Sequence, residues 1–246
     1  MKKPLSIGLD WTKGDADPLS PAKKREVLDY LLSIRVREDI RVNGFNSLLQ
    51  KQCAGRRVLD IGMAEHAMTY VDQPQWKHRL IREVASYILG IDVVPSVIEE
   101  LRKNGYNVRC VDALGDDDLG ERFDVVLCGD VIEHVNDPVR LMRFSKRHLA
   151  PGGRIIVSTP NPFYWGMIRN IFRDGTFIAN LEHVSWITPT MALEIGRRAG
   201  VALSRYSVMD GCRSTMKRLI RPFFPPEFLT LQYVYEFIPV ESVVEA

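Results

Sequence analysis

The stretch Arg57-Val58-Leu59-Asp60-Ile61-Gly62 decides the fold of this chain, because it is a short apolar strand that ends on an acid and a glycine. Similar short apolar stretches follow it along the sequence, at 88–92, 107–111, 123–128 and 154–158. Helical patterns separate these stretches, at 76–87, 95–103 and 137–149. Short apolar strands that alternate with helices indicate βαβ units and a parallel sheet covered on both faces. We therefore predict an α/β, doubly wound fold.

The flanking parts of the chain predict further elements. Ser20-Pro21 precedes apolar residues at helical spacing, which is typical of a capped amphipathic helix. A second helix is expected over 36–50, with Ile40, Phe45, Leu48 and Leu49 facing inward. Near the end of the sequence we expect a helix and then two strands, at 189–199, 202–209 and 231–238.

The composition is typical of a soluble globular protein. The 246 residues are 46% apolar and 26% charged, which excludes a disordered or fibrous chain. No apolar run approaches the roughly 18 residues that a membrane span needs. The net charge of +2 argues against a protein that coats nucleic acid by bulk charge. Four cysteines without metal-ligand spacing, and a first segment interrupted by charges, predict a reduced, cytoplasmic protein.

Acidic residues follow four successive predicted strands. They are Asp60, Asp92, Asp112 and Asp130. Ligands of a doubly wound sheet bind beyond the carboxyl ends of its strands. Asp92 suits both hydroxyls of a ribose, Asp112 suits an adenine amino group, and Asp60 suits a positively charged amino-acid moiety. One loop aspartate is usually a cap or a solvated turn, but four in the same position indicate a binding site.

Taken in order, several segments of the chain resemble the class I S-adenosylmethionine-dependent methyltransferases. They are VLDIG at 58–62, GIDVVPSVIEEL at 90–101, VDAL at 111–114, FDVVLCGDVIEHVNDP at 123–138 and LAPGGRIIVSTPNP at 149–162. The resemblance covers about residues 55–240. Within this family, the chain resembles the ubiquinone-pathway O-methyltransferase type. This resemblance implies a Rossmann-like, seven-stranded sheet, mostly parallel, that ends in an antiparallel hairpin. It also implies S-adenosyl-L-methionine as the cofactor.

The resemblance carries over to a set of cofactor-binding positions. They are Asp60, Gly62, Ala64, His66, Asp92, Val93, Asp112, Ala113, Asp130 and Val131. The family's glycine loop reads acid-x-Gly-x-Gly-x-Gly, and Ala64 and His66 stand here in place of its second and third glycines. His66 either contacts the methionine carboxylate or the substrate, or it is a surface residue. A loop this degenerate also leaves open a catalytically inactive partner subunit that binds the cofactor.

The first loop is also longer than the family pattern. Asp60 and Asp92 lie 32 positions apart, where family members typically have fewer. We expect the extra residues, roughly 67–75, to lengthen the loop after the first strand.

The segment after the fourth strand carries candidate catalytic residues. Asp130, Glu133 and His134 share one face if a helix or turn begins there. His183 follows the fifth strand, which is the neighbour of the fourth in the resembled fold. The resemblance to metal-dependent RNA 2′-O-methyltransferases and to the ubiquinone-pathway type implies that these four residues hold a divalent metal, Mg, Mn or Zn. The alternatives are a metal-free general base, His134 or His183 beside Glu133, and a structural role.

Three segments lie outside the predicted core. Residues 1–54 are expected to form an N-terminal helical cap, and the methyltransferase domain, 55–246, carries insertions at 161–187 and 211–230. The first insertion is aromatic and suits a sugar or a planar ring, or forms a lid with its own small core. The second is basic and apolar, so residues 211–224 suit peripheral membrane contact, a lipid-linked anionic substrate or a plain solvated connection.

These observations predict a cytoplasmic methyltransferase that methylates a hydroxyl group. The expected acceptor is a sugar or glycan, or a small hydroxylated metabolite. A metal-dependent RNA 2′-O-methyltransferase is the alternative enzyme. Nucleic acid is the less favoured partner, because the sequence has no appended RNA-binding module and no broad basic stripe.

Overall fold

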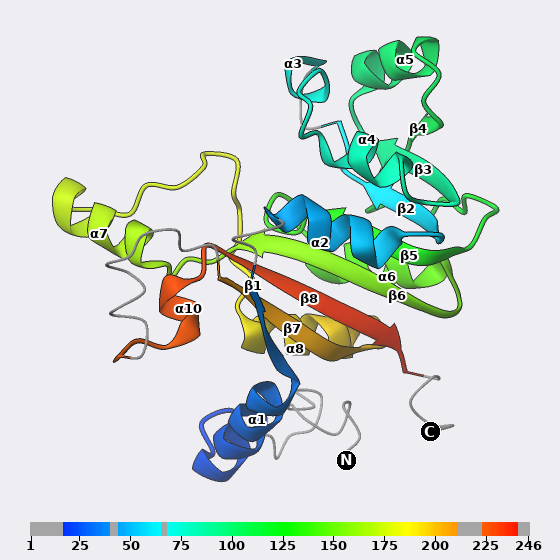
Figure 1. Cartoon of the computed structure of the whole chain (residues 1–246). Helices are drawn as coiled ribbons and strands as arrows, with labels where there is room; N and C mark the ends of the chain where they lie inside the picture. Colours follow the sequence, from blue (N-terminus) through cyan, green and yellow to red (C-terminus); the bar gives the residue numbers. More distant parts are fainter. Residues whose placement is uncertain (1–16, 40–43, 65–67, 211–222, 241–246) are drawn as a thin grey trace.

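The computed structural model describes residues 17–39, 44–64, 68–210 and 223–240. Its strands are β1 (Arg35–Asp39), β2 (Arg57–Ile61), β3 (Tyr87–Asp92), β4 (Val108–Cys110), β5 (Phe123–Gly129), β6 (Leu149–Pro160), β7 (Val201–Asp210) and β8 (Gln232–Pro239). They form one eight-stranded sheet in the order β1-β7-β8-β6-β5-β2-β3-β4 (Figure 1). Only β8 runs antiparallel to its neighbours, β6 and β7. The predicted α/β fold and its antiparallel hairpin are confirmed.

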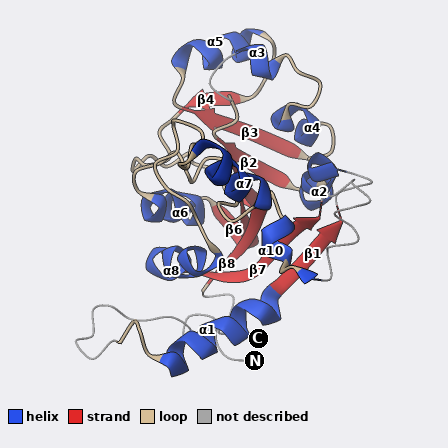
Figure 2. Cartoon of the chain, turned by 90° about the vertical axis from the view of Figure 1, so that its left-hand side faces the viewer, coloured by secondary structure: helices blue, strands red, loops and turns tan. Residues whose placement is uncertain are grey.

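Helices cover both faces of this sheet, as Figure 2 shows. They are α1 (Pro21–Ile34), α2 (Gly44–Cys53), α3 (Met68–Val71), α4 (Lys77–Arg82), α5 (Pro95–Lys103), α6 (Pro138–Arg147), α7 (Trp165–Asp174), α8 (Pro189–Ala199) and α10 (Pro226–Leu229). Three of the longer helices begin at a side-chain cap followed by proline, which satisfies an otherwise unpaired N–H group. The caps are Ser20, Asp137 and Thr188.

Alternating residues of the central strands enter two separate cores. Leu59 and Val126 belong to the larger core, together with residues of α1, α6 and α8. Val58 and Val125 belong to the core on the other face, which α2 and α4 cover. This alternation follows from the period of two along a strand, and it explains why the strands are apolar throughout.

The sheet has one strand more than the seven predicted. The helix expected over 36–50 is wrong at its start, because Arg35–Asp39 forms β1 and the helix begins only at Gly44. β1 pairs in parallel with β7, so that Val36 lies opposite Ser207. The partner strand lies about 170 residues away along the chain, and a local pattern cannot reveal such a pairing.

Two other predicted elements differ in extent. The helix expected over 76–87 ends at Arg82, because Tyr87 already pairs with Arg57 in the sheet. The insertion at 161–187 contains α7, a helix that has no buried residue and lies to one side of the sheet (Figure 1). Most of the insertion at 211–230, and the N-terminal part of the 1–54 segment, lie outside the described residues. The described helices include none long and apolar enough to span a membrane.

Candidate active site

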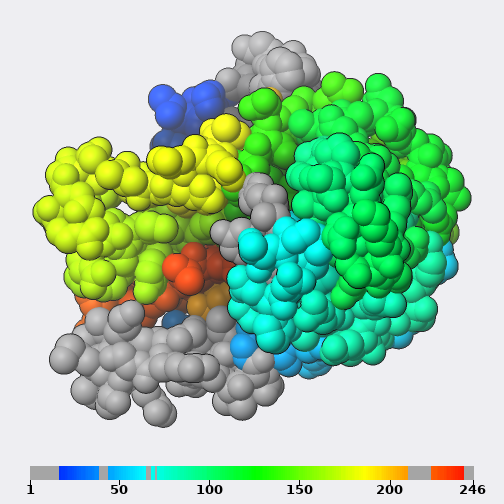
Figure 3. Space-filling model, turned by 90° about the horizontal axis from the view of Figure 1, so that it is seen from above, coloured from blue at the N-terminus to red at the C-terminus, as the bar shows by residue number. Residues whose placement is uncertain are grey.

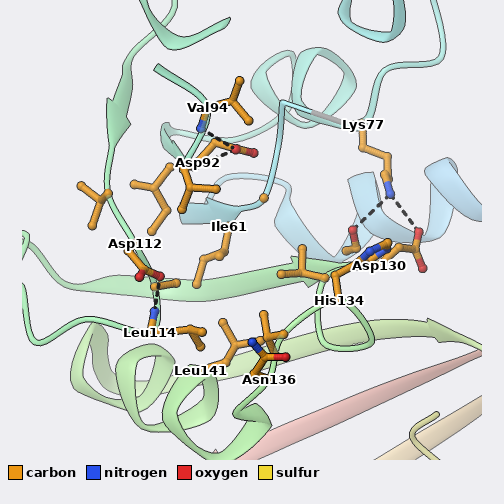
Figure 4. A pocket seen from close by; sticks show the side chains of 18 residues that line it. Ile61, Lys77, Asp92, Val94, Asp112, Leu114, Asp130, His134, Asn136 and Leu141 are labelled. Atoms are coloured by element: carbon orange, nitrogen blue, oxygen red, sulfur yellow. Dashed lines mark hydrogen bonds and ion pairs between the residues drawn. The ribbon is translucent and has the colours of Figure 1, made fainter. Parts of the chain in front are cut away.

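A cavity of about 550 Å³ opens at the carboxyl ends of β2, β3, β4 and β5. Most of the predicted cofactor positions line it, namely Gly62, Asp92, Val93, Asp112, Ala113, Asp130 and Val131. Figure 4 shows Asp92 and Asp112 at one end of the cavity, Lys77 and Asp130 at the other, and Ile61 between them. Figure 3 shows a hollow between the α7 segment and the half of the molecule that carries α3 and α5.

Gly62 is the turn that brings the chain over the cavity. Its φ angle of +74° lies in the left-handed region, which glycine adopts without strain. A Cβ atom at this position would lie 2.3 Å from Cγ2 of Val131, much closer than atoms can pack. The glycine that remains from the family's loop is therefore the one that both the backbone and its neighbour require.

Two carboxylates are fixed at one end of the cavity. Asp92 accepts backbone N–H groups of Val93 and Val94 on Oδ1, at 2.7 and 3.2 Å, and of Ala64 on Oδ2, at 3.0 Å. Asp112 accepts the N–H of Leu114 at 2.8 Å. A carboxylate oxygen can accept more than one hydrogen bond, so both groups can still accept from a ligand. Their orientation suits the hydroxyl and amino groups of an adenosine.

Two predicted cofactor positions do not line the cavity. Asp60 is buried, and its Oδ2 lies 2.8 Å from Nδ1 of His78. Ala64 is buried and uses its N–H on Asp92. His66 lies outside the described residues. Sequence patterns do not reveal His78, since nothing local indicates that α4 returns to β2.

An ion pair closes the other end of the cavity. Nζ of Lys77 lies 2.9 Å from Oδ2 of Asp130 and 3.4 Å from the carbonyl oxygen of Gly129. The other carboxylate oxygen of Asp130 accepts from Ser158 Oγ at 3.1 Å and from Gln232. Asp130 has a φ angle of +60°, the only positive value among the described non-glycine residues. Strained backbone of this kind is concentrated at functional sites.

Glu133, His134 and His183 lie close together, and His134 also lines the cavity. Each offers one ligand atom, and these atoms lie within 4.8 Å of one another. The N–H of Val184 donates to the carbonyl of Glu133 at 2.9 Å, which ties the loop after β6 to the loop after β5. The meeting of these three residues is as predicted. Asp130, the fourth expected metal ligand, lies outside the group, with its carboxylate engaged by Lys77.

The electrostatics of this group are unusual. Glu133 is completely buried, and neither of its carboxylate oxygens has a hydrogen-bond partner among the described residues. Burial raises the pKa of Glu133 to about 7. Burial, and then the neighbouring His134, lower the pKa of His183, whose Nδ1 is also buried without a partner in the described part of the chain. Such atoms usually indicate a missing ligand, and a carboxylate with two imidazoles suits either a divalent ion or proton transfer.

Comparisons with known proteins agree with this geometry. A family model described as a methyltransferase domain matches residues 35–204. The ubiquinone biosynthesis O-methyltransferase of Xanthomonas oryzae pv. oryzae (strain PXO99A) is 30% identical over 44% of this chain and 44% of that enzyme. The enzyme of the same name from Pseudomonas fluorescens (strain Pf0-1) is 29% identical over 50% of this chain and 51% of its own length. The chain thus aligns with about half the length of these relatives.

Solved structures share the fold at low identity. Magnesium protoporphyrin IX methyltransferase from Synechocystis PCC 6803, solved with bound SAH, covers 91% of this chain and 89% of its own, with a TM-score of 0.52 and 14% identity. An SAM-dependent methyltransferase from Archaeoglobus fulgidus covers 79% of this chain and 94% of its own, with a TM-score of 0.52 and 17% identity. Together with the family match and the cavity, this likeness places the chain among the class I S-adenosylmethionine-dependent methyltransferases.

Proposed function

We propose that the protein transfers a methyl group from S-adenosyl-L-methionine to a hydroxyl group of a sugar, a glycan or a small hydroxylated metabolite. The observation that carries this proposal is the grouping of Glu133, His134 and His183, with His134 in the wall of the cofactor cavity. His134 belongs both to this group and to the cavity lining. It therefore links the methyl donor to the groups that can handle the acceptor's proton.

The polar groups at the two ends of the cavity favour one orientation of the cofactor, with adenosine at one end and the methionine part at the other. Asp92 accepts from the ribose hydroxyls and Asp112 from the adenine amino group, because both carboxylates lie at the same end. The apolar side chains of Val93, Ala113 and Leu141 line the wall between the polar groups. The methionine end then points toward Asp130, and the methyl group toward His134.

Methylation of a hydroxyl requires that its proton be removed. The lowered pKa of His183 keeps its imidazole neutral at pH 7, so that a ring nitrogen can accept this proton. The rings of His134 and His183 lie with their centroids 4.8 Å apart, edge to face, so the two imidazoles are in direct contact. A ligand atom of Glu133 lies within 4.8 Å of one on each imidazole, and in its ionised form this carboxylate offsets a positive charge that forms on either ring.

The same three residues fit a divalent metal ion, Mg, Mn or Zn. A positive ion would satisfy the unpartnered oxygens of Glu133 and Nδ1 of His183, and it would offset the cost of a buried carboxylate. When bound, it would lower the pKa of a coordinated hydroxyl group. Asp130 is not needed for this set, since Lys77 already neutralises it.

The surroundings of the group support a ring-bearing acceptor. Trp186 lies 5.5 Å from His183 and 5.4 Å from Phe177 between ring centroids, so an aromatic wall stands beside the proposed base. Aromatic faces stack on sugars and planar rings. The ubiquinone biosynthesis enzymes that align with half of the chain are named as O-methyltransferases, which supports oxygen as the methylated atom.

The proposal is tested with labelled cofactor. The protein is incubated with methyl-labelled S-adenosylmethionine and separate extract fractions of small metabolites, glycans and RNA. We expect label in hydroxyl groups of a non-RNA fraction, and about a 100-fold or greater loss in His183→Ala, as for the loss of a general base. Lys103→Ala, on the exposed side of α5, is the matched control. Label on nitrogen or sulfur would contradict the proposal, and label in RNA would favour the alternative enzyme.

The metal is tested separately by melting. Addition of Mn²⁺ to chelator-treated protein is expected to raise the melting temperature of the wild type by several degrees, because binding to the folded state alone stabilises it. Glu133→Gln and His183→Ala should lose this shift, whereas Lys103→Ala should keep it. If the melting temperatures of all four proteins respond equally to Mn²⁺, a metal at this group is contradicted and a histidine general base remains.

A further inference from the structure

Lys77 occupies a defined place in the cofactor cavity, and no sequence motif indicates it. Its Nζ lies 2.9 Å from Oδ2 of Asp130, and a Cβ atom placed on Gly129 would lie 3.5 Å from the same Nζ. The ammonium group thus lies directly over the backbone at the end of β5. Figure 4 shows it reaching across from α4, at the end of the cavity opposite Asp92 and Asp112.

The neighbours of Lys77 in the sequence fix its position. Nε1 of Trp76 donates to the carbonyl oxygen of Met63 at 2.7 Å, and Trp76 is only 2% exposed. On the other side, Nδ1 of His78 lies 2.8 Å from Asp60, and both residues are buried. Two buried contacts to the end of β2 and its loop therefore hold the backbone on either side of Lys77. The extra residues of the first loop carry the chain back to the cavity at this point.

Asp130 is held independently of Lys77. Its backbone N–H donates to the carbonyl of Ser158 at 3.0 Å, and the hydroxyl of the same serine donates to Oδ1 at 3.1 Å. Gln232 donates to that oxygen as well. Oδ2 would therefore stay in place if Lys77 turned toward a ligand. The ion pair itself is partly exposed, with side-chain accessibilities of 20% and 33%, so exchanging it for another pair costs little.

One positive and one negative group at this end complement an amino-acid zwitterion. We propose that Lys77 binds the carboxylate of the cofactor's methionine part, while Oδ2 of Asp130 accepts from its ammonium group. The protein's own ion pair is exchanged for two pairs with the ligand, and no charge is left unpartnered. Trp76 and His78 are positioning residues in this arrangement. The inference rests on the cofactor orientation given under the proposed function.

The arrangement accounts for the altered glycine loop. With Ala64 and His66 in place of two glycines, the loop has less freedom to bring its backbone close to a ligand. A side chain from α4 can reach the same end of the cavity without that freedom. Lys77 thus offers a side-chain contact at this end of the cavity that does not depend on the glycines.

The test compares two ligands that differ only in the amino-acid part. Titration calorimetry measures the affinity of S-adenosylhomocysteine, and of 5′-methylthioadenosine, which keeps the adenosine and the thioether but lacks the charged groups. In Lys77→Met we expect S-adenosylhomocysteine to bind about tenfold or more weakly, because a charge-assisted hydrogen bond is lost. The affinity for 5′-methylthioadenosine should stay within about twofold.

Controls separate this inference from the proposed function. Lys77→Arg keeps the charge and should retain most of the affinity for S-adenosylhomocysteine. Lys103 is far more exposed than Lys77, so Lys103→Met should leave the affinity for both ligands unchanged. If Lys77→Met loses affinity equally for both ligands, or keeps its affinity for S-adenosylhomocysteine, the role of Lys77 is contradicted while the proposed function stands. Failure of the wild type to bind either ligand would overturn the cofactor orientation, and this inference with it.

Discussion

At the scale of single residues, Gly62 is the most constrained position of the cofactor site. Gly62→Ala should lower the free energy of unfolding by about 2–5 kcal/mol, because the left-handed backbone costs roughly 1–2 kcal/mol and the contact with Val131 costs a further 1–3 kcal/mol. Gly105 has almost the same φ angle, +76°, and a Cβ atom there would have no neighbour within 4 Å. Gly105→Ala should therefore show the backbone cost alone. Urea unfolding of both variants provides the measurement.

A second substitution separates the two costs at Gly62. Val131 carries the clashing methyl group, so Val131→Ala in the Gly62→Ala background should recover the steric part of the loss. Measured against Val131→Ala alone, the added Gly62→Ala change should then cost about as much as Gly105→Ala does. Equal costs for Gly62→Ala and Gly105→Ala would contradict the close approach of the loop to the end of β5.

The residues that the sequence revealed are those whose role follows from local position. Asp92 and Asp112 come directly after strands, and parallel strands end at one edge of a sheet, so their place in the cavity was predictable. Lys77 and His78 belong to the site through α4, a short helix after an irregular loop. Their contacts depend on how that loop returns to the sheet. The contact of Asp60 with His78 depends on the same return of the chain.

At the scale of elements, the end of α6 depends on a buried neutral histidine. Nε2 of His148 accepts the N–H of Leu119 at 3.0 Å, so Nδ1 must carry the proton that it donates to the carbonyl of Phe144, at 2.9 Å. Burial lowers the pKa of His148 below its usual value of about 6.5. The folded state therefore binds a second proton, at Nε2 of His148, less readily than the unfolded state does.

This lowered pKa has a defined sign for stability. The stabilisation is complete above about pH 6.5 and is lost as the pH falls below that value toward the folded-state pKa. Wild-type protein should thus lose more unfolding free energy between about pH 7.5 and 5.5 than His148→Gln, whose amide does not titrate. Urea unfolding at several pH values measures both slopes. Equal slopes would show that His148 does not contribute in this range.

The central strands and β1 show where element prediction succeeds and where it fails. The strands from β2 to β6 contain apolar runs at regular spacing along the chain, so composition and spacing are sufficient to find them, although β6 starts at Leu149, earlier than the predicted 154. β1, with the sequence Arg-Val-Arg-Glu-Asp, has the polar residues of an edge strand. It pairs with the edge that β7 offers, and Glu38 also forms an ion pair with Arg205. Neither condition can be seen within a local window of sequence.

At the scale of the whole molecule, the two faces of the sheet and the carboxyl ends of its strands have different roles. The two cores lie on opposite faces and stabilise the sheet, while the cofactor cavity lies beyond the carboxyl ends of its central strands. The loops after β5 and β6 bring Glu133, His134 and His183 to that end from different parts of the chain. The α7 segment faces the same hollow (Figure 3). The cofactor cavity and the residues proposed to act on the methyl acceptor thus lie together at the carboxyl ends of the strands.

The central claim is that this cavity holds S-adenosylmethionine, and titration calorimetry with S-adenosylhomocysteine tests it most directly. Wild-type protein should bind with measurable heat. Asp92→Ala should bind about 100-fold more weakly, since two hydrogen bonds from ribose hydroxyls to a carboxylate are lost. Asp29→Ala, an exposed residue of α1, should not change the affinity. No binding by the wild type, or equal binding by a folded Asp92→Ala protein, would contradict the account.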